Sequence, residues 1–287
     1  GLRRAALAPT IPTMTGKAVL IDCGANAECT SEYLLQFAYL GSYYAEKVLG
    51  VVQPRVGLLN IGAEPSKGDT LRHETYARLK EAGEQGHLNF IGNIEANTAL
   101  AGGCDVIVAD GYSGNIMLKS VEGAARLMSG ELKKMLTKSA KTKLAYLLLK
   151  DGLADFKKML DPNEVGGTAL LGISRPVVKA HGSSNAAAFC NAVRQTIAVA
   201  ESGIIADITQ NVDKMKVTPE MAAPLQAKYR DYETGALYLE KPEYMTQIEG
   251  DMLVVKNHPR IAFRGKLDSL NASVAAGVLM YAVLRAR

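Results

Sequence analysis

Four short apolar runs divide the first 215 residues of the chain, and each ends abruptly in small, polar, turn-forming residues. Runs this short, rich in Val and Ile and apolar on both faces, are typical of buried parallel strands. We therefore predict strands at residues 18–22, 56–60, 106–110 and 177–180.

The segments between these runs carry apolar residues at helical spacing. Leu34, Leu35 and Ala38 recur in this way after a candidate helix cap at Ser31, which predicts a helix over residues 32–48. Two further helices are predicted at residues 71–82 and 185–200. The repetition of strand, loop and helix predicts an α/β fold with a wound, mainly parallel sheet and flanking helices.

The loops that follow the predicted strands are rich in Gly, Ser and Asn. They occupy residues 23–26, 61–69, 111–115 and 181–185. In an open parallel sheet all four emerge at the carboxyl edge, where ligands bind in such folds. Glycines let the backbone approach a ligand, and N–H groups of turns and helix starts suit an anion. We therefore expect a ligand that carries phosphate or a developing oxyanion.

Each loop also has an ordinary structural interpretation. A Gly-rich turn after a strand is common, and Gly111–Asn115 can be a turn and helix cap without any ligand. His181 can be a satisfied histidine at a strand end, and Lys67 can be a solvated cation. For both residues the glycine-rich surroundings give a functional role the same weight as this ordinary interpretation. A flexible cation in such a loop can reach a phosphate.

A strongly basic segment lies between Lys133 and Lys158. The segment contains eight lysines and two aspartates, so it carries a local charge of +6 within a chain of net charge +4. Leucines from Leu144 to Leu160 recur at helical spacing, which predicts a protruding helical hairpin with one apolar and one basic face. The hairpin either packs on the body or a dimer partner, or docks an acidic protein or anionic lipid. The residues predicted to make such contacts are Lys133, Lys134, Lys138, Lys141, Lys143 and Lys150.

The composition is that of a globular protein. The 287 residues are 48% hydrophobic, and 33 basic residues nearly balance 29 acidic ones, which gives no argument for a nucleic-acid partner. The four cysteines form no CxxC pair, so we expect reduced thiols rather than a disulfide or metal framework. No apolar stretch approaches the roughly 18 residues that span a bilayer. We therefore expect a cytoplasmic protein.

Several motifs resemble one bacterial family. They are Ala6–Thr13, Asp22–Asn26, Tyr44–Gly50, Pro54–Gly62, Asn89–Asn93, Gly166–Gly172 and His181–Asn185. In this order, from about residue 2 to about residue 208, they resemble the acyl-ACP:phosphate acyltransferases of phospholipid synthesis. The resemblance implies a fold related to phosphotransacetylases and isocitrate dehydrogenases, and a homodimer. It also implies transfer of a long-chain acyl group from acyl carrier protein to inorganic phosphate, with no cofactor and no metal.

This chemistry suits the Gly-rich loops, because phosphate is already a nucleophile and catalysis can rest on its positioning. We expect His181 to orient phosphate or protonate the leaving thiolate, and Lys67 to offset phosphate charge. We expect Asn115 and Asn185 to stabilise the tetrahedral intermediate. Backbone N–H groups of the Gly111 and Gly182 loops would contribute to the same task. A covalent cysteine intermediate is not expected. The predicted substrate-binding residues are Asn26, Gly62, Gly68, Gly111, Gly114, Gly166, Gly167, Gly182, Ser183 and Ser184.

The chain departs from the family pattern at both ends. Family members begin with a leading segment that contains an Asp-Ala-Met-Gly-Gly-Asp motif, and this sequence starts after it. The pattern also stops near Val217, so we predict an α/β domain over residues 1–216 and an appendage over residues 217–287.

Pieces of the appendage resemble other families. Glu233–Gly235, Glu240–Glu243 and His258–Leu270 resemble the C-terminal part of ethanolamine-cluster cobalamin adenosyltransferases, and Ser269–Ala276 resembles the last knot motif of SPOUT methyltransferases. Neither resemblance covers a domain, and a chimeric or misassembled reading frame is a further interpretation. Three hypotheses follow: an acyltransferase, a non-catalytic binding protein, and a cobalamin- or nucleotide-binding function in the appendage.

Overall fold

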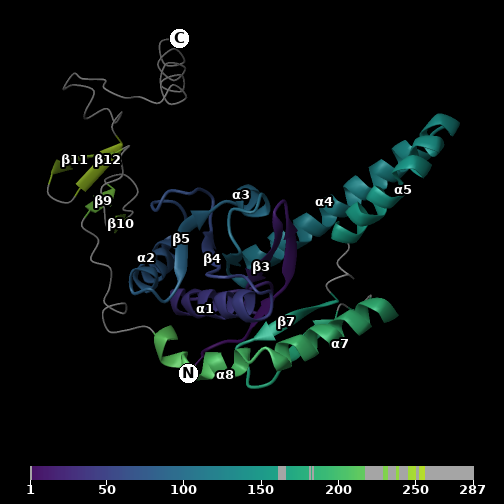
Figure 1. Ribbon diagram of the computed structural model, residues 1–287. Coiled ribbons are helices and arrows are strands. Elements are labelled where there is room, and N and C mark those ends of the chain that lie inside the picture. The colour runs from purple at the N-terminus through teal and green to yellow at the C-terminus, as the bar shows by residue number, and fades with distance from the viewer. Residues whose placement is uncertain are drawn as a thin grey trace, which may run out of the picture. The chain divides into compact units, whose positions relative to one another are not determined.

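The computed structural model describes residues 2–160, 166–180, 182 and 184–216, together with short strands at 229–231, 237–238, 245–249 and 252–255. The chain divides into two compact units, Gly1–Ala223 and Pro224–Arg287. The first unit contains the α/β fold (Figure 1). The predicted appendage, over residues 217–287, begins close to this division.

A five-stranded sheet forms the centre of the first unit. Its strands are, in spatial order, β2 (Thr10–Thr13), β3 (Gly16–Ile21), β6 (Val106–Val108), β4 (Arg55–Leu59) and β5 (Asn89–Ile94). The last four run parallel, and β2 pairs antiparallel with β3 at one edge. The mainly parallel α/β sheet predicted from the sequence is therefore confirmed.

Alternate residues of these strands enter two separate cores. Val19, Ile21 and Val56 face the core that contains α1 (Ser31–Lys47), whereas Leu20 and Ile107 face the other core. Because both faces are covered, the strands are apolar throughout rather than alternating, which is the pattern in the sequence.

A second, three-stranded sheet has the order β1-β7-β8, with β1 (Ala6–Ala8), β7 (Gly167–Leu171) and β8 (Val177–Ala180) all antiparallel. The prediction that residues 177–180 form a buried parallel strand was therefore wrong. Residues 172–176 join β7 to β8, and a parallel crossover needs a dozen residues or more. β8 is also only half-buried, with Val177 exposed.

Other helices described in the first unit include α2 (Thr70–Glu84), α3 (Ala96–Leu100), α7 (Ala186–Glu201), α8 (Ile204–Gln210) and a 3₁₀ turn at Val212–Met215. α1 contacts α2, α8 and strands β3, β4 and β6, and Figure 1 shows it along the central sheet. Its cap is Thr30, whose side chain accepts from the Tyr33 N–H, and not Ser31 as predicted.

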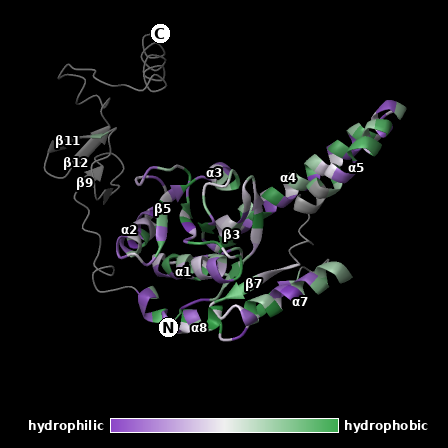
Figure 2. Ribbon diagram, viewed as in Figure 1, coloured by the Kyte–Doolittle hydropathy of each residue, from purple (hydrophilic) through white to green (hydrophobic). Residues whose placement is uncertain are grey.

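A helical hairpin, confirmed as predicted, is formed by α4 (Gly111–Thr137) and α5 (Ala140–Leu160), which pack along each other. In Figure 1 it extends away from the two sheets. Apolar segments run along both helices (Figure 2). Leu148 is 82% exposed and Leu147 is 65% exposed, so much of the apolar surface of the hairpin is uncovered in this chain.

The second unit contains a four-stranded sheet of order β10-β9-β12-β11, formed by β9 (Tyr229–Asp231), β10 (Leu237–Tyr238), β11 (Met245–Glu249) and β12 (Met252–Val255). The motifs at 233–235, 240–243, 258–270 and 269–276 lie outside the described residues. Across the part of the chain that the structure describes, no helix is both long and apolar enough to cross a membrane.

All four cysteines are free. Burial raises the pKa of the Cys23 thiol to about 12 and that of the Cys104 thiol to about 12. Burial also raises the pKa of the half-buried Cys29 thiol to about 11. Cys190, on α7, is exposed.

Val56→Ala tests the central sheet. Val56 is fully buried in β4, and its loss of two methyl groups should lower the free energy of unfolding by about 2 kcal/mol. The same change at Val52, which is 87% exposed, should alter stability by less than about 0.5 kcal/mol. Chemical denaturation followed by circular dichroism measures both variants, and equal effects would contradict the assigned burial.

Thiol titration with a coloured disulfide reagent tests the cysteine environments. A raised pKa means less thiolate, so at pH 8 roughly one part in a thousand of Cys29 is reactive, and Cys23 and Cys104 are less ionised still. One thiol should react rapidly in the native chain, and all four should react after unfolding. Cys190→Ser should remove the rapid phase. Two or more rapid thiols in the native chain would contradict the structure.

Candidate functional site

A buried carboxylate, Asp22, organises the first loop of the site. It directly follows β3 and is fully buried. Its Oδ1 accepts N–H bonds from Leu7 at 2.8 Å and Cys23 at 2.7 Å, and its Oδ2 accepts from the Asn26 N–H at 2.7 Å. Since Leu7 belongs to β1, this one side chain joins the end of the central sheet to the second sheet.

The first turn of α4 fits closely against this loop. The Gly111 N–H donates to the Asn26 carbonyl at 2.9 Å. A Cβ at Gly111 would collide with that carbonyl, and a Cβ at Gly114 would collide with the Asp22 carbonyl. Residues 111–115 are therefore helical and not an open loop, and their glycines allow close packing.

Two of the predicted amide side chains differ in their surroundings. The Asn26 Nδ2 donates to the Ala5 carbonyl at 2.8 Å and to the Asp22 Oδ2 at 3.1 Å, so this amide is engaged within the protein. Asn115 is exposed, and its side chain lies 3.7 Å from the position that a Cβ on Gly24 would occupy. Asn115 thus flanks the first loop with its amide accessible.

The loop after β4, residues 61–69, carries Lys67. The Asn60 Nδ2 donates to the Lys67 carbonyl at 3.0 Å, and Gly68 has a φ of +94°, a conformation that favours glycine. The stem of Lys67 lies over Gly62, where a Cβ would come within 2.8 Å of the Lys67 Cγ. Within the described residues, the exposed Lys67 ammonium has no ion-pair partner.

Asp110, which directly follows the apolar run of β6, is 5% exposed and caps α4. It accepts from the Ser113 N–H at 2.8 Å and forms an ion pair with Arg72 of α2. Burial would raise the pKa of Asp110, but the Ser113 hydrogen bonds and the Arg72 charge outweigh it and lower that pKa below its usual value. Asp110 is therefore a carboxylate at neutral pH.

Carboxylates thus cap two of the helices that start at this edge, since Asp69 caps α2 in the same way as Asp110 caps α4. A carboxylate reduces the positive potential of a helix start. α7 differs, because its cap is the neutral Asn185 and its first turn has no acidic residue. The start of α7 is consequently the more favourable of the three for an anion.

The fourth predicted loop follows β8 of the second sheet, so the prediction that it leaves the same sheet edge as the other three loops was wrong. His181 and Ser183 lie outside the described residues. Gly182 is exposed, and the Ser184 Oγ is a buried atom without a hydrogen-bond partner in the described part of the chain. Asn185 accepts the Ala188 N–H at 2.8 Å.

Two glycines predicted to bind substrate, one directly before β7 and one at its first position, pack against neighbouring elements. A Cβ on Gly166 would collide with the Ala192 N–H of α7, and one on Gly167 would approach Val178 of β8 at 2.5 Å. Their observed contacts are therefore with the protein itself.

Sequence reasoning missed several charged residues near the site. Besides burial, the charges that act on the Cys23 thiol include Lys119 of α4 and Lys179 of β8, which both lower its pKa and so oppose the rise. The charge of Lys179 thus acts on the first loop from β8. Asp22 and Asp110 could have been recognised as carboxylates directly after apolar strands, whereas nothing in the sequence of α2 marked Arg72.

The predicted contact lysines all lie on the hairpin and are exposed. Lys133, Lys134 and Lys138 lie at the end of α4, whereas Lys141, Lys143 and Lys150 lie on α5.

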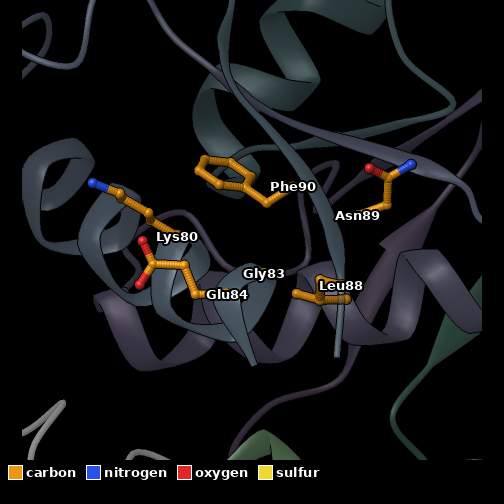
Figure 3. A pocket seen from close by; sticks show the side chains of 6 residues that line it. All are labelled: Lys80, Gly83, Glu84, Leu88, Asn89 and Phe90. Carbon is orange, nitrogen blue, oxygen red and sulfur yellow. The ribbon is translucent and has the colours of Figure 1, made fainter. Parts of the chain in front are cut away.

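A hollow of about 280 Å³ lies elsewhere, between the end of α2 and the start of β5 (Figure 3). It is lined by Lys80, Gly83, Glu84, Leu88, Asn89 and Phe90. Because β5 runs parallel to its neighbours, its first residues lie at the sheet edge opposite the Gly-rich loops. The loops, and not this hollow, gather the candidate chemistry. No cluster of three or more His, Cys, Asp or Glu able to hold a metal ion occurs among the described residues.

Comparison with known proteins matches residues 1–207 to the family described as "Fatty acid synthesis protein". The phosphate acyltransferase of Lysinibacillus sphaericus is 46% identical over 218 residues, which are 76% of this chain and 65% of the relative. That of Staphylococcus aureus strain MSSA476 is 48% identical over 214 residues, 74% of this chain and 64% of the relative. The chain thus spans slightly less than two thirds of the length of these relatives.

Among solved structures, a branched-chain phosphotransacylase from Enterococcus faecalis is 16% identical, with a TM-score of 0.44 over 68% of this chain and 65% of that chain. A phosphotransacetylase from Staphylococcus aureus is 17% identical, with a TM-score of 0.39 over 70% of this chain and 55% of that chain.

The family match covers both sheets of the first unit and every loop that carries the candidate site. It ends at residue 207, close to the end of the predicted resemblance, which is thereby confirmed. The chain belongs to the fatty acid synthesis protein family that includes the bacterial phosphate acyltransferases.

Proposed function

We propose that this chain transfers a fatty acyl group from the thioester of acyl carrier protein to inorganic phosphate, giving an acyl phosphate for phospholipid synthesis. The observation that carries the proposal is the arrangement of the loops after β3, β4 and β6. These strands are adjacent and parallel, so their loops lie together at one sheet edge. The Lys67 ammonium, unpaired among the described residues, stands in one of them and is available to offset the charge of a phosphate.

The reaction needs no activated protein nucleophile. An oxygen of phosphate attacks the thioester carbonyl carbon, a C–O bond forms, the C–S bond breaks, and the carrier thiolate leaves and takes up a proton. We assign the proton donation to His181. A thiol nucleophile is disfavoured, since burial raises the pKa of Cys23 to about 12 and little thiolate is present at neutral pH.

One hydrogen bond guides our choice of the groups that stabilise the oxyanion. The Gly111 N–H is bonded to the Asn26 carbonyl, so it is not free to stabilise an oxyanion. We therefore assign this task to the Asn115 and Asn185 amides with the backbone of the Gly182 loop. We propose that phosphate lies near the neutral start of α7 and that Lys67 offsets its charge.

The hairpin supports a role in partner recognition. Its exposed lysines suit acidic acyl carrier protein, and the exposed leucines beside them suit peripheral contact with an anionic membrane. We propose that a cytoplasmic homodimer uses this surface at the membrane, where acyl chains are consumed. Binding without turnover is the alternative that the experiments below distinguish.

Lys67→Ala tests the catalytic assignment. Loss of a cation that offsets phosphate charge should lower kcat/KM for phosphate about 10- to 100-fold. The assay follows phosphate-dependent release of carrier protein from palmitoyl-acyl carrier protein. Lys80→Ala, an exposed lysine beside the opposite hollow, is the matched control and should leave turnover unchanged. Equal activities of the two variants would argue against a role for Lys67.

Sedimentation with vesicles tests the hairpin. Wild-type chain should sediment with phosphatidylglycerol vesicles and not with phosphatidylcholine vesicles. Leu148→Asn should weaken this binding several-fold through lost apolar burial, and Lys134→Gln through lost charge. Lys80→Gln is the control for charge. Salt-sensitive binding to carrier protein without vesicle binding would assign the surface to the carrier instead.

A further inference from the structure

Arg72 connects two of the loops that form the candidate site. It lies in the first turn of α2, and its guanidinium forms an ion pair with Asp69 at 3.1 Å and another with Asp110. The same guanidinium donates to the Ser113 Oγ at 2.9 Å. Asp69 ends the loop that carries Lys67, whereas Asp110 and Ser113 form the start of α4. One side chain therefore holds both segments.

The two residues that follow Arg72 make further links of this kind. A His73 Nε2 lies 3.0 Å from the Ser66 carbonyl, one residue before Lys67. The Ser31 Oγ donates to the Glu74 Oε2 at 2.8 Å, which ties α2 to the start of α1. The first turn of α2 thus contacts the segments that follow β3, β4 and β6.

The charges around Arg72 argue against a role for its guanidinium in binding phosphate. Two carboxylates already neutralise its guanidinium, and its side chain is only 16% exposed. Gly68 fits against it, since a Cβ there would lie 2.7 Å from the Arg72 Cβ. The planar fork of an arginine can meet three oxygen acceptors at once, whereas a lysine ammonium is a single point charge.

We propose that Arg72 is a positioning residue, which rests on the proposed function. It fixes the separation between Lys67, on the loop after β4, and Asn115, one turn into α4. Lys67 and Asn115 themselves contact the substrate, while Arg72 acts through them. Weakening the contacts of Arg72 should impair the use of phosphate, although every group that touches phosphate is still present.

Hydrogen–deuterium exchange of the full chain tests the mechanical link without any need for turnover. In Arg72→Lys, exchange should rise together in residues 61–69 and 110–117. Arg55→Lys is the matched control, because Arg55 pairs with Asp105 and donates to the Gly102 carbonyl at the opposite sheet edge. In Arg55→Lys, the rise in exchange should be confined to the surroundings of Arg55, Gly102 and Asp105. Unchanged exchange in either loop of the Arg72 variant would overturn the proposal.

Kinetics test whether the link matters for acyl transfer. Arg72→Lys should lower kcat/KM for phosphate about tenfold while KM for the acyl donor stays constant, and Arg55→Lys should leave both values unchanged. On an Asn115→Ala background the same substitution should cost much less, because Arg72 acts through Asn115. Full additivity of the two substitutions, or equal losses for both arginine variants, would overturn the positioning role.

The two proposals fail in different ways. Absence of turnover in the folded wild-type chain would contradict the proposed acyl transfer, and with it the kinetic role of Arg72. Wild-type turnover with an unchanged Arg72→Lys variant would contradict the positioning role alone.

Discussion

The arrangement of this molecule depends on the buried carboxylate of Asp22. Five N–H groups donate to it, from the backbone of Leu7, Cys23, Ala25 and Asn26 and from the Asn26 amide. A fully buried carboxylate is stable only when such donors compensate the water that it has lost. These bonds fix where β3 ends and how β1, with the rest of the second sheet, meets it. The first loop of the site is therefore a consequence of the joint between two sheets.

The remaining parts of the site depend on this contact between the two sheets. Asp22 and Asn26 provide the surface against which Gly111 and Gly114, at the start of α4, pack. Asp110 then caps α4 and receives Arg72 from α2. Lys67 and Asn115, which flank these contacts, are exposed. Such preorganised donors are what an acyl transfer to phosphate requires, since positioning and charge stabilisation supply most of the rate.

The sequence predicted the three inner strands of the central sheet, β3, β6 and β4, because they are covered on both faces and are apolar throughout. It missed the two edge strands, β2 and β5, and it was wrong at β8, whose short link to β7 rules out a parallel crossover. The Gly-rich loops identified the site edge, yet not the roles of single residues. Asn26 resembles a ligand-binding residue in sequence but is engaged with Ala5 and Asp22. Nothing in the sequence around Arg72 marked its link to α4, because Asp110 and Ser113 are 38 and 41 residues away.

The nature of the nucleophile is the central claim, and an isotope experiment tests it most directly. The intact chain would be incubated with palmitoyl-acyl carrier protein and phosphate labelled with oxygen-18, and the lipid products analysed by mass spectrometry. The account predicts palmitoyl phosphate in which the oxygen bonded to the acyl carbon carries the label. Unlabelled palmitic acid formed by water, with no acyl phosphate at any phosphate concentration, would contradict it.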